Sequence, residues 1–322
     1  MTVQNICKNT IKVSGIIVNF IVLSIIIPVL AYAVYALWDS EQIYSAADKS
    51  QYAVYKPSVK TYQRDDNDDE FNKLQKRNPD VIAWLDVFGT HIDYPVAQGK
   101  TNLTYLNTNI EGEYSLAGSI FMDSDNVRDF SEFNTILYGH HMDKNAMFGD
   151  IGNFLEKEIF DSRRYGSLFY NEKEYGIEFF AFVHTDAYDW KIYFPGINEE
   201  ERKQEYIDYI LSKAMHKRDA DVGVNDRLVL LSTCSARSTN GRDILVGKIT
   251  DKTYEDPFLN MKDLDDVKKP LGEAYSRGIS MVIPWWLLML TLLLAARLMA
   301  HIPAALNRAT RINRYKKQVI SI

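Results

Sequence analysis

Two long apolar segments and a series of short alternating segments divide the chain. Residues 13–38 contain no charged side chain, and residues 279–298 form a second, mostly apolar run. A helix rises about 1.5 Å per residue, so each run is long enough to cross the ~30 Å hydrocarbon core of a bilayer. The pattern therefore predicts two transmembrane helices with a soluble part between them.

The soluble part holds short β-type segments separated by Gly, Pro, Asn and Asp. At least seven strands are predicted, over residues 81–87, 90–96, 118–122, 135–138, 177–184, 227–231 and 243–250. Many short strands with turn residues between them are typical of a barrel. We therefore expect a mainly β domain over residues 79–255, closed or nearly closed into a β-barrel with peripheral helices.

Two segments with a helical pattern interrupt these strands. The first covers residues 148–160. The second starts at Asn198 as the N-cap, has acidic residues in its first turn, and continues through Tyr206, Ile207, Ile210 and Leu211. A helix at this position would either form the wall of a groove or cross over the outside of the barrel, and the sequence leaves both arrangements open.

Polar segments flank the barrel on both sides. Residues 39–78 predict a helical stalk that stops at Asn78-Pro79, and residues 256–278 predict a linker that includes Asp256-Pro257-Phe258. The acidic run at 64–70 lacks the glycine and the distal glutamate of a helix-loop-helix calcium site. We interpret this run as a solvated, charged face.

Charged residues indicate the orientation of the two spans. Lys8 and Lys12 precede the first span and the tail 299–322 is basic, which predicts that residues 1–12 and 299–322 are both cytoplasmic. All 43 acidic residues lie between the spans, where the net charge is about −14. We therefore expect a two-pass plasma-membrane protein with an acidic extracellular domain and no nucleic-acid partner.

The first span has an alternative interpretation as a cleaved signal peptide. Ala31-Tyr32-Ala33 matches the small-x-small pattern that precedes a cleavage site. The apolar stretch is longer than the ~7–15 residues of a usual signal core. We therefore expect a retained anchor.

Cys7 and Cys234 are the two cysteines, and the predicted topology places them on opposite sides of the membrane. They cannot pair, so Cys234 is either a buried apolar residue or a reactive thiol. It ends an apolar strand, and Arg242 begins the next strand eight residues later. A hairpin would bring the two together, where a fixed cation lowers the pKa of a thiol and can stabilise an oxyanion.

A histidine follows another predicted strand. Residues 134–138 are followed by Gly139, and His140 comes directly after this glycine. Imidazole is the usual proton shuttle near neutral pH. Each of the three residues is weak evidence alone, but together they predict Cys234 as nucleophile, His140 as acid/base and Arg242 as the cation on the oxyanion side. No ligand cluster suggests a cofactor or a metal.

The motifs around these three residues resemble those of the sortase family, and most closely class B. They are Ser232-Thr233-Cys234, Tyr138-Gly139-His140 and Arg242, with further similar blocks at 78–85, 92–96 and 118–123. The resemblance covers roughly residues 70–250. It implies a closed sortase-type β-barrel of about seven or eight strands and the catalytic residues His140, Cys234 and Arg242. His141 carries no such implication, whereas Ser232 and Thr233 would contact the substrate.

The resemblance implies a cysteine transpeptidase and endopeptidase. Such an enzyme cleaves a C-terminal sorting-signal pentapeptide of an exported protein through a Cys thioacyl intermediate. It then transfers the protein to an amine of a peptidoglycan precursor or of a pilin. A C-terminal span is better known among pilin-polymerising class C enzymes than in class B, so wall anchoring and pilus assembly both stay open. No cofactor is implied.

Other protein classes fit the sequence less well. A non-enzymatic anchored surface protein would share the C-terminal apolar run and basic tail, but residues 268–280 contain no Leu-Pro-x-Thr-Gly-like pentapeptide. An L,D-transpeptidase would need a Ser-His-Gly-Cys motif, which the sequence lacks. A papain-like peptidase has its cysteine before its histidine, whereas here His140 precedes Cys234.

Overall fold

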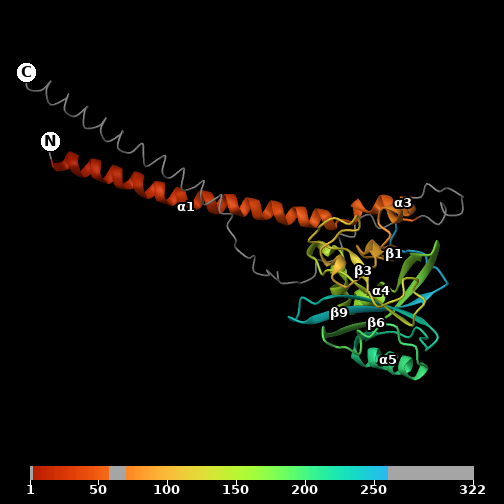
Figure 1. Cartoon of the computed structure of the whole chain (residues 1–322). Helices are drawn as coiled ribbons and strands as arrows, with labels where there is room; N and C mark the ends of the chain where they lie inside the picture. Colours follow the sequence, from red (N-terminus) through yellow and green to blue (C-terminus); the bar gives the residue numbers. More distant parts are fainter. Residues whose placement is uncertain (1–2, 58–69, 260–322) are drawn as a thin grey trace, which may run out of the picture. The chain divides into compact units, whose positions relative to one another are not determined.

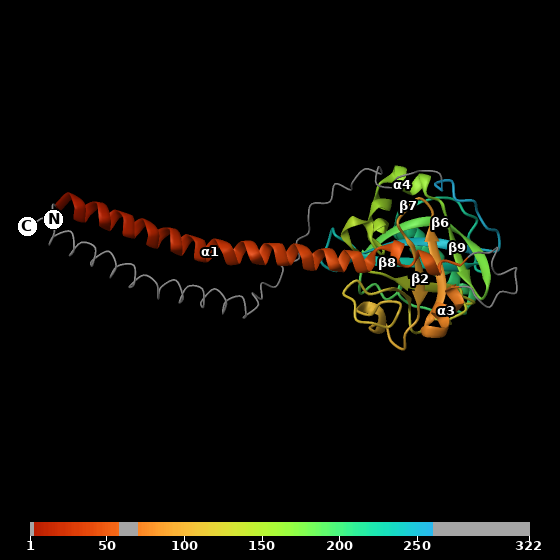
Figure 2. The ribbon, with the colours of Figure 1, turned by 90° about the horizontal axis from the view of Figure 1, so that it is seen from above.

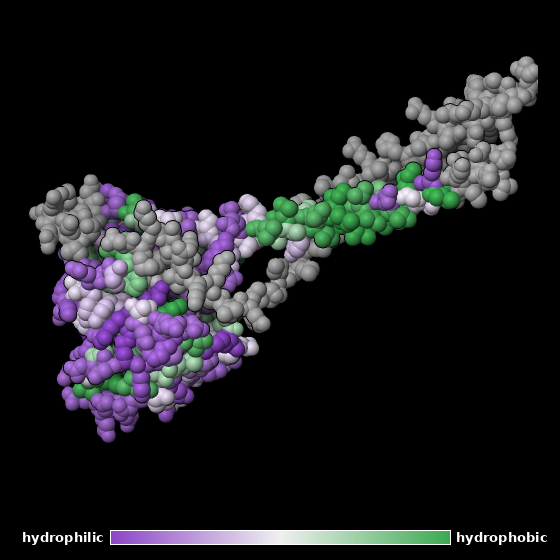
Figure 3. Space-filling model, turned by 180° about the vertical axis from the view of Figure 1, so that it is seen from behind, coloured by the Kyte–Doolittle hydropathy of each residue, from purple (hydrophilic) through white to green (hydrophobic). Residues whose placement is uncertain are grey.

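The computed structural model describes residues 3–57 and 70–259 (Figure 1). It divides between Glu41 and Gln42 into two units. Helix α1 (Val3–Ala47) carries the first apolar run, and its residues from Ile11 onward are long and apolar enough to cross a membrane. Figure 3 shows the apolar side chains of this helix, which supports anchoring by the N-terminal segment. The predicted second span and basic tail lie outside the described residues.

Within the described residues of the second unit, nine strands form one sheet. In chain order they are β1 (Val81–Val87), β2 (Asp93–Ala97), β3 (Ile120–Met122), β4 (Asn134–Tyr138), β5 (Tyr165–Tyr170), β6 (Lys173–Asp186), β7 (Ala214–Lys217), β8 (Arg227–Cys234) and β9 (Gly241–Thr250). Their order is β5-β1-β2-β3-β4-β8-β9-β6-β7, and an additional β5–β6 pairing closes eight of them into a ring. The predicted closed barrel is confirmed.

The sequence pattern missed β5 and β7 and misplaced some strand ends. β5 contains Gly166 and Ser167, which weaken an apolar alternation, and β7 is a four-residue strand added to β6 outside the ring. The predicted strand at 90–96 begins only at Asp93, because Thr90 forms a turn in which its Oγ1 donates to Val87 O and accepts from Ile92 N. β8 extends beyond its predicted end to Cys234.

Helices surround the barrel, and Figure 2 shows α4 (Lys157–Ser162) and α3 (Glu70–Arg77) on opposite sides of it. The segment predicted at 148–160 is the 3₁₀ helix η5 (Gly149–Leu155) followed by α4 (Lys157–Ser162). The second is α5 (Glu200–Lys213), whose N-cap is Glu199. The predicted cap at Asn198 is wrong by one residue, and no side chain caps this helix end.

The segment between α1 and the barrel is broken into short helices. These are η1 (Lys49–Gln51), η2 (Ala53–Tyr55) and α3 (Glu70–Arg77), which buries Phe71 and Leu74 and ends just before Asn78-Pro79. Most of the acidic run lies outside the described residues. Two further 3₁₀ turns, η3 (Thr104–Leu106) and η4 (Asp143–Asn145), lie in loops of the barrel. Phe258 of the predicted linker lies beneath the Arg163 guanidinium, 5.5 Å from ring centroid to Cζ.

Strands β8 and β9 are buried on both faces. Val229, Leu231 and Leu245 belong to the apolar cluster inside the barrel. Their neighbours Leu228, Leu230, Ile244 and Val246 belong to a second cluster, which the buried face of α5 covers from outside. Because side chains alternate along a strand, Ser232, Cys234 and Arg242 lie on the outer face, whereas Thr233 and Asp243 face inward.

Candidate active site

Cys234 and Arg242 face each other across a hairpin. β8 and β9 pair antiparallel with Cys234 opposite Arg242 and Thr233 opposite Asp243. The loop between the strands is closed by hydrogen bonds from Ser235 N to Gly241 O (2.8 Å) and from Gly241 N to Ser238 O (3.2 Å). The expected hairpin is therefore confirmed, and it leaves Cys234 as a half-buried, free thiol at the end of its strand.

His140 lies at the same edge of the barrel, two residues beyond the end of β4. This strand runs parallel to β8, and Tyr138 is the partner of Ser232. The chain after β4 stays bonded to β8 for one more residue: Gly139 N donates to Ser232 O (3.2 Å) and Thr233 Oγ1 donates to Gly139 O (2.8 Å). His140 and Cys234 each lie two residues beyond the Tyr138–Ser232 pair, so adjacent parallel strands deliver both to one end of the barrel.

The His140 ring is oriented by a backbone carbonyl. Its Nε2 lies 2.8 Å from Leu106 O. A carbonyl oxygen can only accept, so the neutral ring carries its proton on Nε2. Nδ1 is then the nitrogen that can gain or lose a proton during a reaction. Gly139 is required beside it, because a Cβ at this position would lie 2.8 Å from the Phe148 ring.

Arg242 keeps most of its hydrogen-bonding capacity. Its Nη1 donates to Gly241 O at 3.0 Å, and none of the described residues provides a carboxylate partner. Its neighbour Asp243 differs, because this inward carboxylate is bound by Arg237 Nη2 (2.7 Å) and His184 Nδ1 (2.8 Å). Of the two arginines beside the hairpin, Arg237 has a carboxylate partner, whereas Arg242, which faces Cys234, has none among the described residues.

Tyr193 joins the site from the segment between β6 and α5. Its hydroxyl lies 2.8 Å from Ser232 Oγ, and its ring stacks on Tyr138 with centroids 6.2 Å apart. Burial raises the pKa of Tyr193 to about 12; the hydrogen bond with Ser232 and the charge of Arg242 oppose this shift, whereas Cys234 adds to it. Sequence reasoning missed this residue. The signal in the sequence was the aromatic-rich stretch at 188–194. Its Ile192 and Tyr193 pack with residues of α5 in the outer apolar cluster.

Ser232, Thr233 and His141 lie close to the site but in different surroundings. Ser232 and Thr233 are each 2% exposed, and their hydroxyls bind Tyr193 and Gly139 O, respectively. Their role as substrate contacts stays a prediction. His141 is partly buried, and its Nδ1 has no hydrogen-bond partner among the described residues. Burial lowers the pKa of His141, with Asp243 opposing this shift.

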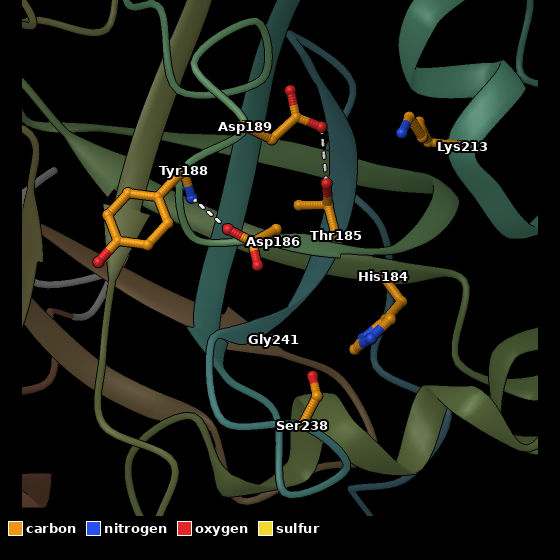
Figure 4. Close-up of a pocket in the computed structure, with 8 residues that line it drawn as sticks. All are labelled: His184, Thr185, Asp186, Tyr188, Asp189, Lys213, Ser238 and Gly241. Atoms are coloured by element: carbon orange, nitrogen blue, oxygen red, sulfur yellow. Dashed lines mark hydrogen bonds between the residues drawn. The ribbon is translucent and has the colours of Figure 1, made fainter.

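An open pocket of about 450 Å³ borders the hairpin on the β6 side (Figure 4). Gly241, next to Arg242, is part of its lining and pairs with Asp186 at the end of β6. The carboxylate of Asp186 accepts from Tyr188 N, and that of Asp189 accepts from the Thr185 hydroxyl. The pocket is thus a recess with polar groups in its lining, and its lining includes the residue that precedes Arg242 in the sequence.

Residues 3–57 and 70–259 contain no group of three or more His, Cys, Asp and Glu side chains that could hold a metal ion.

Known proteins support an assignment of family. No protein-family model matches the chain. The chain is 31% identical over 220 residues to the sortase B of Listeria monocytogenes, which covers 67% of this chain and 88% of that protein. A further comparison is with the crystal structure of sortase B from the type II pilus of Streptococcus pneumoniae, at 49% identity and a TM-score of 0.51, covering 56% of this chain and 99% of that one.

A substrate complex is among the similar structures. The Staphylococcus aureus sortase B–substrate complex is 33% identical with a TM-score of 0.54, and covers 63% of this chain and 97% of that one. These similarities exclude the alternative of a non-enzymatic surface protein. The match extends over most of the Listeria sortase, and the strand order pairs the ends of β4, β8 and β9. This chain therefore belongs to the class B sortases and is a sortase transpeptidase.

Proposed function

We propose that Cys234, His140 and Arg242 are the catalytic residues of this transpeptidase. The Cys234 thiolate attacks the carbonyl carbon of the scissile peptide bond and forms a C–S bond. The C–N bond then breaks, and the leaving amine takes a proton from His140 Nδ1. The products of this half-reaction are a thioacyl enzyme and the released C-terminal fragment, so it is also an endopeptidase cleavage.

The second half-reaction reverses the proton transfer. The acceptor amine attacks the thioacyl carbon and gives a proton to His140. A C–N bond forms, the C–S bond breaks, and the Cys234 thiolate is regenerated. The observation that carries the proposal is the in-register placement of Cys234 opposite Arg242 with His140 at the same strand edge.

Arg242 is the proposed cation for the tetrahedral oxyanion. It lies on the face of Cys234 and has no carboxylate partner among the described residues, so its remaining N–H donors are available. Donors that are already in place stabilise a developing charge without reorganisation. Tyr193 holds Ser232 beside this position, and Ser232 with Thr233 is the proposed contact for the sorting-signal backbone.

The proposed substrate is the C-terminal sorting-signal pentapeptide of an exported protein, and we favour a pilin amine over a peptidoglycan precursor as acceptor. The pneumococcal sortase B described as belonging to a type II pilus is 49% identical to this chain, compared with 31% for the Listeria protein. The proposed location is the plasma membrane, which the chain crosses twice, with the catalytic domain outside and residues 1–12 and 299–322 on the cytoplasmic side.

The test uses the full chain in detergent, with sorting-signal peptides and either a lysine-containing pilin segment or a glycine-type wall acceptor. Transfer to the lysine amine, detected by mass spectrometry and absent in Cys234→Ala, is the expected result. Transfer to the wall acceptor alone would overturn the pilin assignment. Transfer that survives in Cys234→Ala would overturn the proposed nucleophile.

A further inference from the structure

The residues that follow His140 form a closed and strained loop. We define the His loop as residues 140–148. Phe148 N donates to His140 O at 3.0 Å, which joins its two ends, and His141 and Met147 form an isolated β-bridge. Three non-glycine residues within it have positive φ, namely Lys144 (57°), Asn145 (59°) and Met147 (52°). Such conformations are costly and persist where the surroundings hold them.

The base of the His loop is held by a buried tyrosine hydroxyl. Tyr94 OH, on β2, accepts from Met147 N (3.2 Å) and donates to Ala47 O (2.9 Å). Ala47 is the last residue of α1, and Ala47, Tyr94 and Met147 are 0%, 2% and 1% exposed. Both backbone groups would be buried without a partner if this hydroxyl were removed, which is costly in a protein interior.

The tip of the His loop touches the same turn of α1. Tyr44 OH donates to Asp143 Oδ2 at 3.2 Å, and the Lys144 ammonium lies 4.7 Å from the centroid of the Tyr44 ring. Tyr44 and Ala47 both belong to the unit that contains the barrel. The last turn of α1 therefore contacts the strained loop at two separate points.

We infer that Tyr94, Tyr44 and Asp143 are positioning residues that hold the His loop, and through it His140, against the last turn of α1. The inference rests on the proposed acid/base role of His140. The loop begins at the imidazole-bearing residue, and its closure at Phe148 transmits a shift at Met147 to the His140 backbone. The helix that carries the apolar anchor is thereby part of the support for the proton-transfer group.

Burial makes the Tyr94 contact insensitive to pH. It raises the pKa of Tyr94 well above its ordinary value. The hydroxyl thus stays protonated and can donate to Ala47 O throughout the neutral range.

The test is Tyr94→Phe in the full chain, with kcat expressed per Cys234 that forms a thioacyl adduct. We expect kcat to fall about tenfold, the loss expected for a misplaced proton-transfer group, while KM for the sorting peptide changes less than about twofold. Tyr170→Phe is the matched control, because Tyr170 is also 2% exposed and its hydroxyl accepts from Arg227 at the start of β8, the opposite end of that strand from Cys234. A purely structural role would lower the fraction of molecules that acylate and leave kcat per adduct unchanged, which would overturn the inference.

A second set of variants avoids the protein interior. Tyr44→Phe and Asp143→Ala each remove the hydrogen bond between these two side chains, which lies at the surface of the loop, where loss of the fold is not expected. We expect each to lower kcat about twofold, and the double variant to show no further loss because both remove one contact. Fully additive effects, or none, would contradict coupling through this contact.

The proposed function has a separate control. If His140→Ala transfers at the wild-type rate, the acid/base role fails. If transfer depends on His140 but not on Tyr94, Tyr44 or Asp143, only the positioning inference fails.

Discussion

The two faces of the barrel rim differ in how their charges are compensated. On the outer rim, which we define as His140, Cys234 and Arg242, the guanidinium has no carboxylate partner among the described residues. On the inner rim, defined as His141, His184, Arg237 and Asp243, the carboxylate is 3% exposed and binds both Arg237 and His184. Residues adjacent in sequence thus have opposite surroundings.

This difference separates groups that stabilise the fold from groups that remain free for chemistry. A paired buried charge is costly to disturb but has little capacity left for a substrate. Replacing an unpaired cation beside a thiol changes the free energy of unfolding little. Such a cation can instead stabilise negative charge that develops during a reaction. Similar substitutions on the two rims should therefore have different effects.

The largest contrast is expected between the two histidines. His140→Ala should lower kcat for transfer by about 10²–10⁴-fold, the range for loss of a general acid/base. His141→Asn should retain kcat within about threefold, because the proposed mechanism uses no atom of His141. Steady-state transfer assays on the two purified variants provide the comparison. Equal losses would show that both rims take part in proton transfer.

The two arginines should also differ. Arg242→Lys keeps the charge but loses the planar fork, and we expect kcat to fall about 10²-fold, as for loss of an oxyanion donor. Arg237→Lys, in the loop after Cys234, should change kcat by less than about threefold and act mainly on stability. Kinetics with one sorting peptide would decide, and a full-rate Arg242→Lys would mean that Arg242 contributes only a general field.

Asp243 should matter for stability. Asp243→Ala leaves Arg237 and His184 without their shared partner, and we expect it to lower the free energy of unfolding by about 2 kcal/mol, less than for a fully buried pair because both partners are partly exposed. Urea unfolding of the full chain in detergent measures this. An unchanged unfolding midpoint would remove the distinction between the rims.

The smallest effect is a pH dependence from His141. Burial lowers its pKa from the ordinary value of 6.5, so below about pH 6.5 the unfolded chain binds a proton that the folded chain resists. The wild-type protein should lose stability as the pH falls through this range. Thermal unfolding of His141→Asn should show a shallower loss, and parallel curves for the two proteins would refute the assignment.

The sequence predicted the outer rim because its geometry follows from strand ends. Cys234 and Arg242 are eight residues apart around one hairpin, and His140 follows a strand and a single glycine, Gly139. Local patterns are sufficient for such features. Leu106 O and Tyr193 could not be found this way, because a backbone carbonyl 34 residues from His140 and a tyrosine 39 residues from Ser232 reach the site only through the fold.

The inner rim was equally hidden from sequence. Asp243 begins the predicted last strand as an ordinary charged residue, and its partners come from β6 and from the loop after Cys234. Strand β7 was missed because a short edge strand with partly exposed side chains carries little apolar signal. Tertiary pairing determines these features.

The most direct test of the catalytic assignment is the intact mass of the full chain after mixing with a sorting-signal peptide and no amine acceptor. We expect a thioacyl adduct on Cys234, located by peptide mapping, with a mass increase equal to the cleaved N-terminal fragment less one water. The adduct should form far more slowly in His140→Ala and Arg242→Lys than in His141→Asn and Arg237→Lys. An adduct on any residue other than Cys234, or equal rates in the outer-rim and inner-rim variants, would contradict it.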